Sequence, residues 1–194
     1  MRYLSVFEND KDILLAFNDI HLKGNWFDLD CTFSKGILYK DIKRPKYISD
    51  LYPQVEGCVQ DDSTILSKFP DGLLNSIVFD PPFLFRNRKS ENNDRMSNRF
   101  TYFNSYDDLI QMYEKSLKCF YFKLKPKGYV LFKCQDMSDD KFYSTHCDVI
   151  NMAEKIGFKL KDIAIKVSKS KLQKDAKQQN CLAKVHSYWL VFRK

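Results

Sequence analysis

Residues 73–83, LLNSIVFDPPF, constrain the fold of this chain more than any other stretch. The letters IVF favour a strand, and the apolar run around them predicts that this strand is buried. Two consecutive prolines donate no backbone hydrogen bonds, so the strand must end at Asp80. This ending has two interpretations: a proline-terminated strand with a solvated acid, or a rigid catalytic motif that holds Phe83 near a carboxylate.

Other short apolar runs alternate with stretches of helical pattern along the chain. We expect strands within 26–33, 46–53, 56–63, 73–79, 128–136, 158–167 and 186–194. We expect a helical lead-in over residues 1–25, a helix over 105–124 capped by Ser105, and a helix over 142–156 ended by Gly157. Such alternation predicts an α/β fold with a mostly parallel sheet and an antiparallel strand at the C-terminus.

Several of the expected strands end at an acid. These acids are Asp30, Asp50, Asp61 with Asp62, Asp80 and Asp136. The carboxyl ends of parallel strands meet at one edge of a sheet, where ligands bind in folds of this class. The series of acids therefore predicts one site at that edge.

Composition narrows the class of protein. The 194 residues are 44% hydrophobic, which is typical of one ordered globular domain. Lys and Arg number 32 against 25 Asp and Glu, and the net charge of +7 favours a polyanionic partner, nucleic acid first. A soluble protein with a basic surface would show the same excess.

The six cysteines form no CxxC pair and no Cys/His set with zinc-finger spacing. We therefore expect reduced thiols in a cytoplasmic protein, and no metal. The adjacent His146 and Cys147 are interpreted as helix residues rather than metal ligands. No apolar run approaches the roughly 18 residues of a membrane span, so no signal peptide and no membrane partner are expected.

The order of these motifs resembles that of the class I S-adenosylmethionine-dependent methyltransferases across residues 26–194. FDPPF is similar to the (D/N/S)PP(Y/F/W) motif of the amino-methyltransferases, which methylate exocyclic amines of bases in nucleic acid. The resemblance implies a Rossmann-like fold with a mostly parallel seven-stranded sheet, an antiparallel C-terminal strand and helices on both faces. It also implies S-adenosyl-L-methionine as the cofactor and no metal.

The segment DLDCTFSKG, residues 28–36, matches the family's first cofactor loop. Asp30 matches the acid of this loop and Gly36 its final glycine. Ser34 stands where the family has another glycine, which implies a different path of the loop, because glycine lets the backbone approach a cofactor closely. The segment also resembles the D-x-T-x-x-[KR]-G loop of phage-type DNA methylases.

Further acids match the family's contacts to the nucleoside of the cofactor. Asp50 matches the acid that accepts from the ribose hydroxyls, and Asp62, rather than Asp61, the acid that accepts from the adenine amine. Leu66 or Ile65 would pack on the adenine. The full set of cofactor contacts that the resemblance implies is Asp30, Thr32, Gly36, Asp50, Leu51, Asp61, Asp62, Ser63 and Asp80.

An aromatic exocyclic amine is a weak nucleophile because its lone pair is delocalised into the ring. Asp80 and the Pro81 carbonyl can each accept one of its N–H groups, which favours a pyramidal nitrogen and stabilises the developing charge. Pro81 and Pro82 make these acceptors rigid, and Phe83 offers a ring face to a flipped base. The expected catalytic residues are Asp80, Pro81, Pro82 and Phe83.

Residues 84–105 are polar and predict a mobile substrate loop, although a charged run can also be a solvated loop without a role. Phe85, or Tyr102 with Phe103, would add stacking on the base. The cations suited to phosphate contacts are Arg86, Arg88, Lys89, Arg95, Arg99 and Lys133.

The favoured function is methylation of DNA at adenine N6, or at cytosine N4. A single domain over residues 1–194 leaves no room for a separate target-recognition domain, so a relaxed specificity or a protein partner that supplies recognition is expected. One alternative is an RNA amino-methyltransferase, because RNA offers unpaired bases. Another is a catalytically inactive nucleic-acid-binding relative, which Ser34 favours and the intact DPPF and Asp50 disfavour. A protein-lysine methylase is a further alternative, but the basic charge disfavours it.

Overall fold

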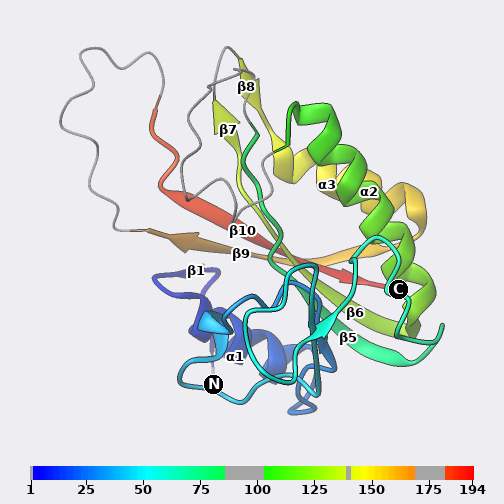
Figure 1. The fold of residues 1–194 in the computed structure, drawn as a ribbon. Coiled ribbons are helices and arrows are strands. Elements are labelled where there is room, and N and C mark those ends of the chain that lie inside the picture. Colours follow the sequence, from blue (N-terminus) through cyan, green and yellow to red (C-terminus); the bar gives the residue numbers. More distant parts are fainter. Residues whose placement is uncertain (1, 86–102, 139–140, 169–181) are drawn as a thin grey trace.

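The computed structural model describes residues 2–85, 103–138, 141–168 and 182–194 (Figure 1). Its centre is an eight-stranded sheet with the order β1-β9-β10-β6-β5-β2-β3-β4. These strands are β1 (Val6–Phe7), β2 (Leu29–Asp30), β3 (Tyr47–Asp50), β4 (Val59–Gln60), β5 (Leu74–Phe79), β6 (Leu124–Cys134), β9 (Lys159–Val167) and β10 (His186–Arg193). A small antiparallel pair, β7 (Met137–Ser138) and β8 (Phe142–Tyr143), follows β6.

The sheet is mostly parallel, as the sequence predicts. β10 alone runs antiparallel to its neighbours in the described sheet, pairing with β6 on one side and β9 on the other. The seven expected strands are present, and their order places β5 and β2 side by side at the centre. The expectation of an α/β class I methyltransferase fold is thus confirmed.

The N-terminal segment differs from the expected helical lead-in. It begins with β1, an eighth strand that pairs parallel with β9, and continues into helix α1 (Asp10–Ile20). The strand is only two residues long and its Val6 is exposed, so it carries little apolar signal. Asn9 caps the helix by accepting a hydrogen bond from the Asp12 amide.

Helices cover both faces of the sheet, as expected. α1 lies on one face, and α2 (Tyr106–Lys123) and α3 (Thr145–Ile156) lie together on the other (Figure 1). The side chains of β5 alternate between these layers: Ile77 and Phe79 join the core beneath α2 and α3, whereas Val78 joins the core beneath α1. The predicted Ser105 cap is present, with its hydroxyl accepting from the Asp108 amide.

Some boundaries differ from those expected. The third helix starts at Thr145 rather than at 142, because Phe142 and Tyr143 form β8. It ends as predicted at Gly157, whose φ of 116° lies in the left-handed region. The connection between β2 and β3 contains only a 3₁₀ turn, η1 (Ile37–Tyr39), so a loop rather than an α-helix borders the carboxyl end of β2.

Candidate active site

The carboxyl ends of three neighbouring strands carry the site. Asp30 ends β2, Asp50 ends β3, and Asp80 directly follows β5. β2 is hydrogen-bonded to both β3 and β5 in parallel, so these three acids lie at the same edge of the sheet. For these three acids, the predicted convergence at one edge of the sheet is therefore found in the fold.

Asp30 is fully buried and fixes the loop that follows it. Its Oδ1 accepts from the Thr32 amide at 2.8 Å and from the Thr32 hydroxyl at 3.2 Å, and its Oδ2 accepts from the Tyr39 hydroxyl at 2.9 Å. Burial, with a smaller contribution from the charge of Asp80, raises the pKa of Asp30 to about 7 against the lowering effect of these hydrogen bonds. Asp30 is thus a structural anchor of the loop as well as a candidate cofactor contact.

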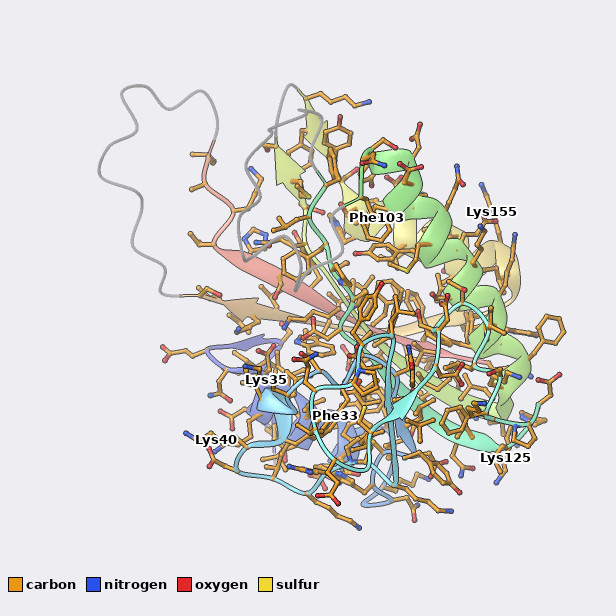
Figure 2. The ribbon with its side chains drawn as sticks, viewed as in Figure 1. Phe33, Lys35, Lys40, Phe103, Lys125 and Lys155 are labelled. Atoms are coloured by element: carbon orange, nitrogen blue, oxygen red, sulfur yellow. The ribbon has the colours of Figure 1, made fainter. Side chains whose placement is uncertain are left out.

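The loop takes a glycine-like path in spite of Ser34. Ser34 has a φ of 48°, in the left-handed region where the family has a glycine, and its amide donates to Asp50 Oδ2 at 2.8 Å. Gly36 has a φ of 70°, and a Cβ there would lie 2.6 Å from Cζ of Phe33. Phe33 is buried, whereas Lys35 is exposed (Figure 2). The backbone at Gly36 is therefore packed closely against the Phe33 ring, and the Lys35 side chain is directed to solvent.

Asp50 joins two loops and retains acceptor capacity. Its Oδ2 accepts from the Ser34 amide, and its Oδ1 accepts from the Tyr52 amide at 2.8 Å. A carboxylate has about four lone-pair positions, so each oxygen can accept one more hydrogen bond. Two such acceptors suit the vicinal hydroxyls of a ribose. The adjacent Leu51 is partly exposed at the same edge.

Asp61 and Asp62 have different roles. The buried Asp61 side chain accepts from the amides of Asp62, Ser67 and Lys68, so it holds the turn after β4. Asp62 is less buried, and its Oδ1 accepts from the amide and hydroxyl of Thr64. Asp61 is thus committed to the turn, whereas Asp62 Oδ2 accepts no hydrogen bond among those found for the described residues.

Two residues next to these acids differ in exposure. Ile65 is 61% exposed, whereas Leu66 is fully buried in the core, so Ile65 has the accessible surface of the two. The Ser63 hydroxyl lies 3.1 Å from that of Ser116 on α2, which fixes its side chain to that helix.

The Asp-Pro-Pro-Phe motif is held from both sides. The Asp80 amide donates to the Thr32 hydroxyl at 2.8 Å, and the Tyr113 hydroxyl of α2 donates to the Pro82 carbonyl at 2.9 Å. Pro81 is buried, while Phe83 is half-buried. The chain therefore leaves β5 on a fixed path, with its aromatic ring only partly covered.

A row of alternating charges runs behind the motif. Lys133 Nζ of β6 lies 3.0 Å from Asp80 Oδ2 and 3.2 Å from Asp10 Oδ1 at the start of α1. Asp10 also contacts Lys166 Nζ at 2.9 Å and accepts from the Trp189 indole at 2.9 Å. Burial raises the pKa of Asp80, opposed by Lys133, and the two acids raise the pKa of Lys133 despite its burial.

This row corrects one expectation. Lys133 is only 7% exposed and is enclosed by two carboxylates, so it does not offer its charge to a phosphate. Phe85 differs as well: it is buried and packs edge-on against Tyr106 and Tyr143, so its ring is core rather than a stacking surface. The other predicted phosphate contacts, Arg86, Arg88, Lys89, Arg95 and Arg99, lie outside the described residues, as does Tyr102.

Three contributors were missed at the level of sequence: Asp10, Tyr39 and Tyr113. Asp10 sits at a helix start, where an acid is usually only favourable to the helix dipole. The tyrosines fall in apolar patterns that predict core. Only the three-dimensional contacts distinguish these residues from ordinary helix and core positions.

The order and direction of the strands give the fold of the class I methyltransferases. The sequence model of a DNA methylase family, N6_N4_Mtase, matches residues 74–194, more than half of the chain. The chain belongs to this DNA methylase family, which is dependent on S-adenosylmethionine. A comparison with curated protein sequences found no match.

Solved structures agree on the fold. PvuII DNA methyltransferase (cytosine-N4-specific) is 18% identical with a TM-score of 0.50, over 70% of this chain and 48% of that one. A SAM-dependent methyltransferase from Archaeoglobus fulgidus is 13% identical with a TM-score of 0.51, over 96% and 95% of the two chains. A protein described as a candidate hemolysin from Lactococcus lactis is 15% identical with a TM-score of 0.56, over 95% and 86%. The chain spans about half the length of the DNA methylases that it matches.

The donor and acceptor set at the strand ends fits S-adenosylmethionine. Asp50 has the capacity for a ribose diol, and Asp62 can accept from an adenine amine. Among the described residues, no group of three or more His, Cys, Asp or Glu side chains could hold a metal ion, and no helix there is long and apolar enough to cross a membrane.

Proposed function

We propose that this protein transfers a methyl group from S-adenosyl-L-methionine to an exocyclic amino group of a DNA base, with adenine N6 favoured over cytosine N4. The observation that carries the proposal is the placement of the Asp-Pro-Pro-Phe motif. It follows β5 directly and is hydrogen-bonded, through Thr32, to the loop that matches a cofactor loop.

The cofactor contacts follow from the acceptors at the strand ends. Asp50 accepts from the ribose hydroxyls, Asp62 accepts from the adenine amine, and Ile65 packs on the adenine ring. Leu51, Ser63 and the Thr32–Gly36 loop complete the proposed binding surface. When bound, S-adenosylmethionine supplies an electrophilic methyl group on a sulfonium centre.

Asp80 acts on the target amine. Lys133 already donates to its Oδ2, so Oδ1 has the greater free acceptor capacity and accepts an N–H of the base. The Pro81 carbonyl accepts the second N–H, and the hydrogen bond from Tyr113 to the Pro82 carbonyl holds the motif in place. These two acceptors hold the nitrogen in a pyramidal arrangement and stabilise the positive charge that develops on it. The raised pKa of Asp80 makes its carboxylate a better acceptor for the proton that the methylated nitrogen must lose.

To reach these groups, the target base must be flipped out of the DNA duplex. Phe83 is half-buried and offers one ring face to a flipped base. Phe103, which lies beyond the undescribed segment and pairs with Phe85, adds a second aromatic ring beside α2 (Figure 2). The cations of residues 86–99 bind the phosphates flanking the target, and a protein partner supplies sequence recognition.

The test is transfer of a labelled methyl group to duplex DNA, single-stranded DNA and total RNA, followed by digestion to nucleosides. We expect label in N6-methyladenine of DNA. Label in N4-methylcytosine would correct the base, and label in RNA alone would overturn the choice of DNA.

Two variants assign the roles of the acids in that assay. Asp80→Asn keeps the shape of the side chain but removes its charge, so kcat should fall by about 100-fold or more while the Kd for S-adenosylmethionine changes little. Asp50→Asn should instead raise that Kd. A normal rate of transfer by Asp80→Asn would exclude the proposed role of the motif.

A further inference from the structure

A second cluster of reactive side chains lies just beyond the carboxyl end of β6, and the proposed function does not use it. Asp136 follows β6 by two residues, and His146 and Cys147 lie in the first turn of α3. His146 Nδ1 lies 2.7 Å from Asp136 Oδ1, and His146 Nε2 lies 3.3 Å from Cys147 Sγ. The three groups therefore form a continuous chain of hydrogen bonds from a carboxylate to a thiol.

The hydrogen bonds in this cluster have a defined donor-to-acceptor direction. Asp136 is 4% exposed, and a carboxylate beside an imidazole nitrogen accepts the ring N–H. With the proton on Nδ1, Nε2 carries the lone pair and accepts from the thiol S–H. His146 is thus oriented as a base toward Cys147, the relation between nucleophile, base and orienting acid that activates weak nucleophiles.

Other contacts fix the histidine ring in this orientation. The His146 ring is stacked on Tyr188 of β10, with centroids 4.3 Å apart and planes inclined by 20°. The Tyr188 hydroxyl lies 3.1 Å from His186 Nε2, and the backbone amide of His146 also donates to Asp136. Packing and hydrogen bonding therefore hold the base in place before any reactant arrives.

Cys147 differs from the other described cysteines. Cys31 and Cys134 are buried, and burial raises the pKa of each well above its usual value. Burial also raises the pKa of Cys58 and of Cys119 to about 11. Cys147 is the exposed thiol among the described cysteines, and it is the one that contacts a histidine.

We propose that Cys147 is a nucleophilic thiol, activated by His146 and Asp136, and that it is a site of modification by hydrogen peroxide and by alkylating electrophiles. His146 Nε2 takes the thiol proton, and the thiolate sulfur attacks one oxygen of the peroxide. An S–O bond forms as the O–O bond breaks, and the departing hydroxide takes the proton from His146 and leaves as water. Sulfur is oxidised to a sulfenic acid and the peroxide is reduced.

The test is the rate of alkylation of each cysteine by iodoacetamide at pH 7, followed by mass spectrometry of peptides from the intact chain. A thiol without a base is only a few per cent ionised at this pH, so Cys147 should react about tenfold faster than free cysteine. Cys58 in the same sample is the internal reference and should react more slowly than free cysteine. Exposure to hydrogen peroxide with a sulfenic-acid trap should label the Cys147 peptide first.

Variants separate activation from mere exposure. His146→Gln keeps a polar side chain but removes the base, so the rate at Cys147 should fall to that of free cysteine while Cys58 is unchanged. Tyr188→Phe keeps the stacked ring and should retain a fast Cys147. The proposal would be overturned if Cys147 of the wild type were alkylated no faster than free cysteine. It would also be overturned if the His146→Gln protein kept the wild-type melting temperature and an undiminished rate of alkylation at Cys147.

Discussion

The amide of Asp80 donates a hydrogen bond to the hydroxyl of Thr32 at 2.8 Å. The same hydroxyl donates to Asp30 Oδ1 at 3.2 Å, so the end of β5 is tied to the end of β2 through one side chain. Hydrogen bonds in such a series polarise one another. The loop proposed to bind the cofactor and the motif proposed to act on the base are therefore connected through the Thr32 side chain.

Thr32→Val tests this connection. Valine has nearly the shape of threonine but cannot accept from the Asp80 amide, and a poorly satisfied buried N–H costs about 1–3 kcal/mol. We expect kcat for methyl transfer to fall by about tenfold or more, with a smaller rise in the Kd for S-adenosylmethionine. Thr32→Ser keeps the hydroxyl and is the matched control. Equal activity of the valine and serine variants would mean that the connection does not position Asp80.

Lys133→Met tests the row of charges behind the motif. Removing this lysine leaves Asp80 and Asp10 without their shared cation, and loss of one partner from a buried ion pair costs about 3–5 kcal/mol. Chemical denaturation should show this loss in the free energy of unfolding. Lys166→Met is the control, because Lys166 is more exposed and contacts Asp10 but not Asp80.

A double variant refines the same experiment. Lys133→Met combined with Asp10→Asn removes one uncompensated charge along with the cation. The combined loss of stability should therefore be smaller than the sum of the two single losses. Strict additivity would show that Lys133 and Asp10 are not energetically coupled.

Asp30 predicts a dependence of stability on pH. Its pKa is about 7 in the folded protein, against 3.8 for an ordinary Asp, so between these values the folded state binds more protons than the unfolded state. The stability it contributes is complete below about 3.8 and is lost as the pH rises through about 7. The raised pKa of Asp80 acts in the same direction.

Asp30→Asn should therefore flatten the pH profile. The fall in the free energy of unfolding between pH 4 and pH 7 should shrink by about 1 kcal/mol or more. Asn can still accept from Thr32, and its amide can donate to the Tyr39 hydroxyl. Denaturation curves at several pH values provide the measurement, with the exposed Asp41→Asn as the control. An Asp30→Asn profile parallel to that of the wild type would contradict the assignment.

The sequence was sufficient to predict the part of the candidate site that is formed by the ends of strands. The run before Asp80 and the acids at 30 and 50 predicted the edge of the sheet that carries the site, because a proline pair and a terminal acid both mark where a strand stops. The burial of Lys133 between two acids could not be predicted from such a pattern. A lysine near a strand end is usually solvated, and its burial depends on Asp10, which is more than 100 residues away in sequence.

The conformation of Ser34 also depends on a contact that is distant in the sequence. Its departure from glycine predicted a different path of the loop, but the residue takes a φ of 48° and the loop keeps a glycine-like course. The hydrogen bond from its amide to Asp50 offsets the cost of that conformation. The local preference of Ser34 was overridden by a contact between this loop and the end of β3.

Gly36→Ala tests how closely the loop is packed. A Cβ at this position would lie 2.6 Å from Phe33 Cζ, and the Phe33 ring is buried and stacked on Tyr39. The ring has little room to move, so overpacking of about 1–3 kcal/mol should add to the cost of a left-handed alanine. The loop should shift, and the Kd for S-adenosylmethionine should rise in calorimetric titration.

Gly24→Ala is the matched control for this clash. Gly24 has a φ of 82°, similar to the 70° of Gly36, but a Cβ there would meet nothing within 4 Å. Both variants carry the strain of a left-handed alanine, about 1–2 kcal/mol, and only Gly36→Ala adds a collision. Gly24→Ala should therefore lose less stability and bind S-adenosylmethionine normally. If the two variants bound the cofactor equally well, the packing of Phe33 on Gly36 would have no part in shaping the proposed cofactor site.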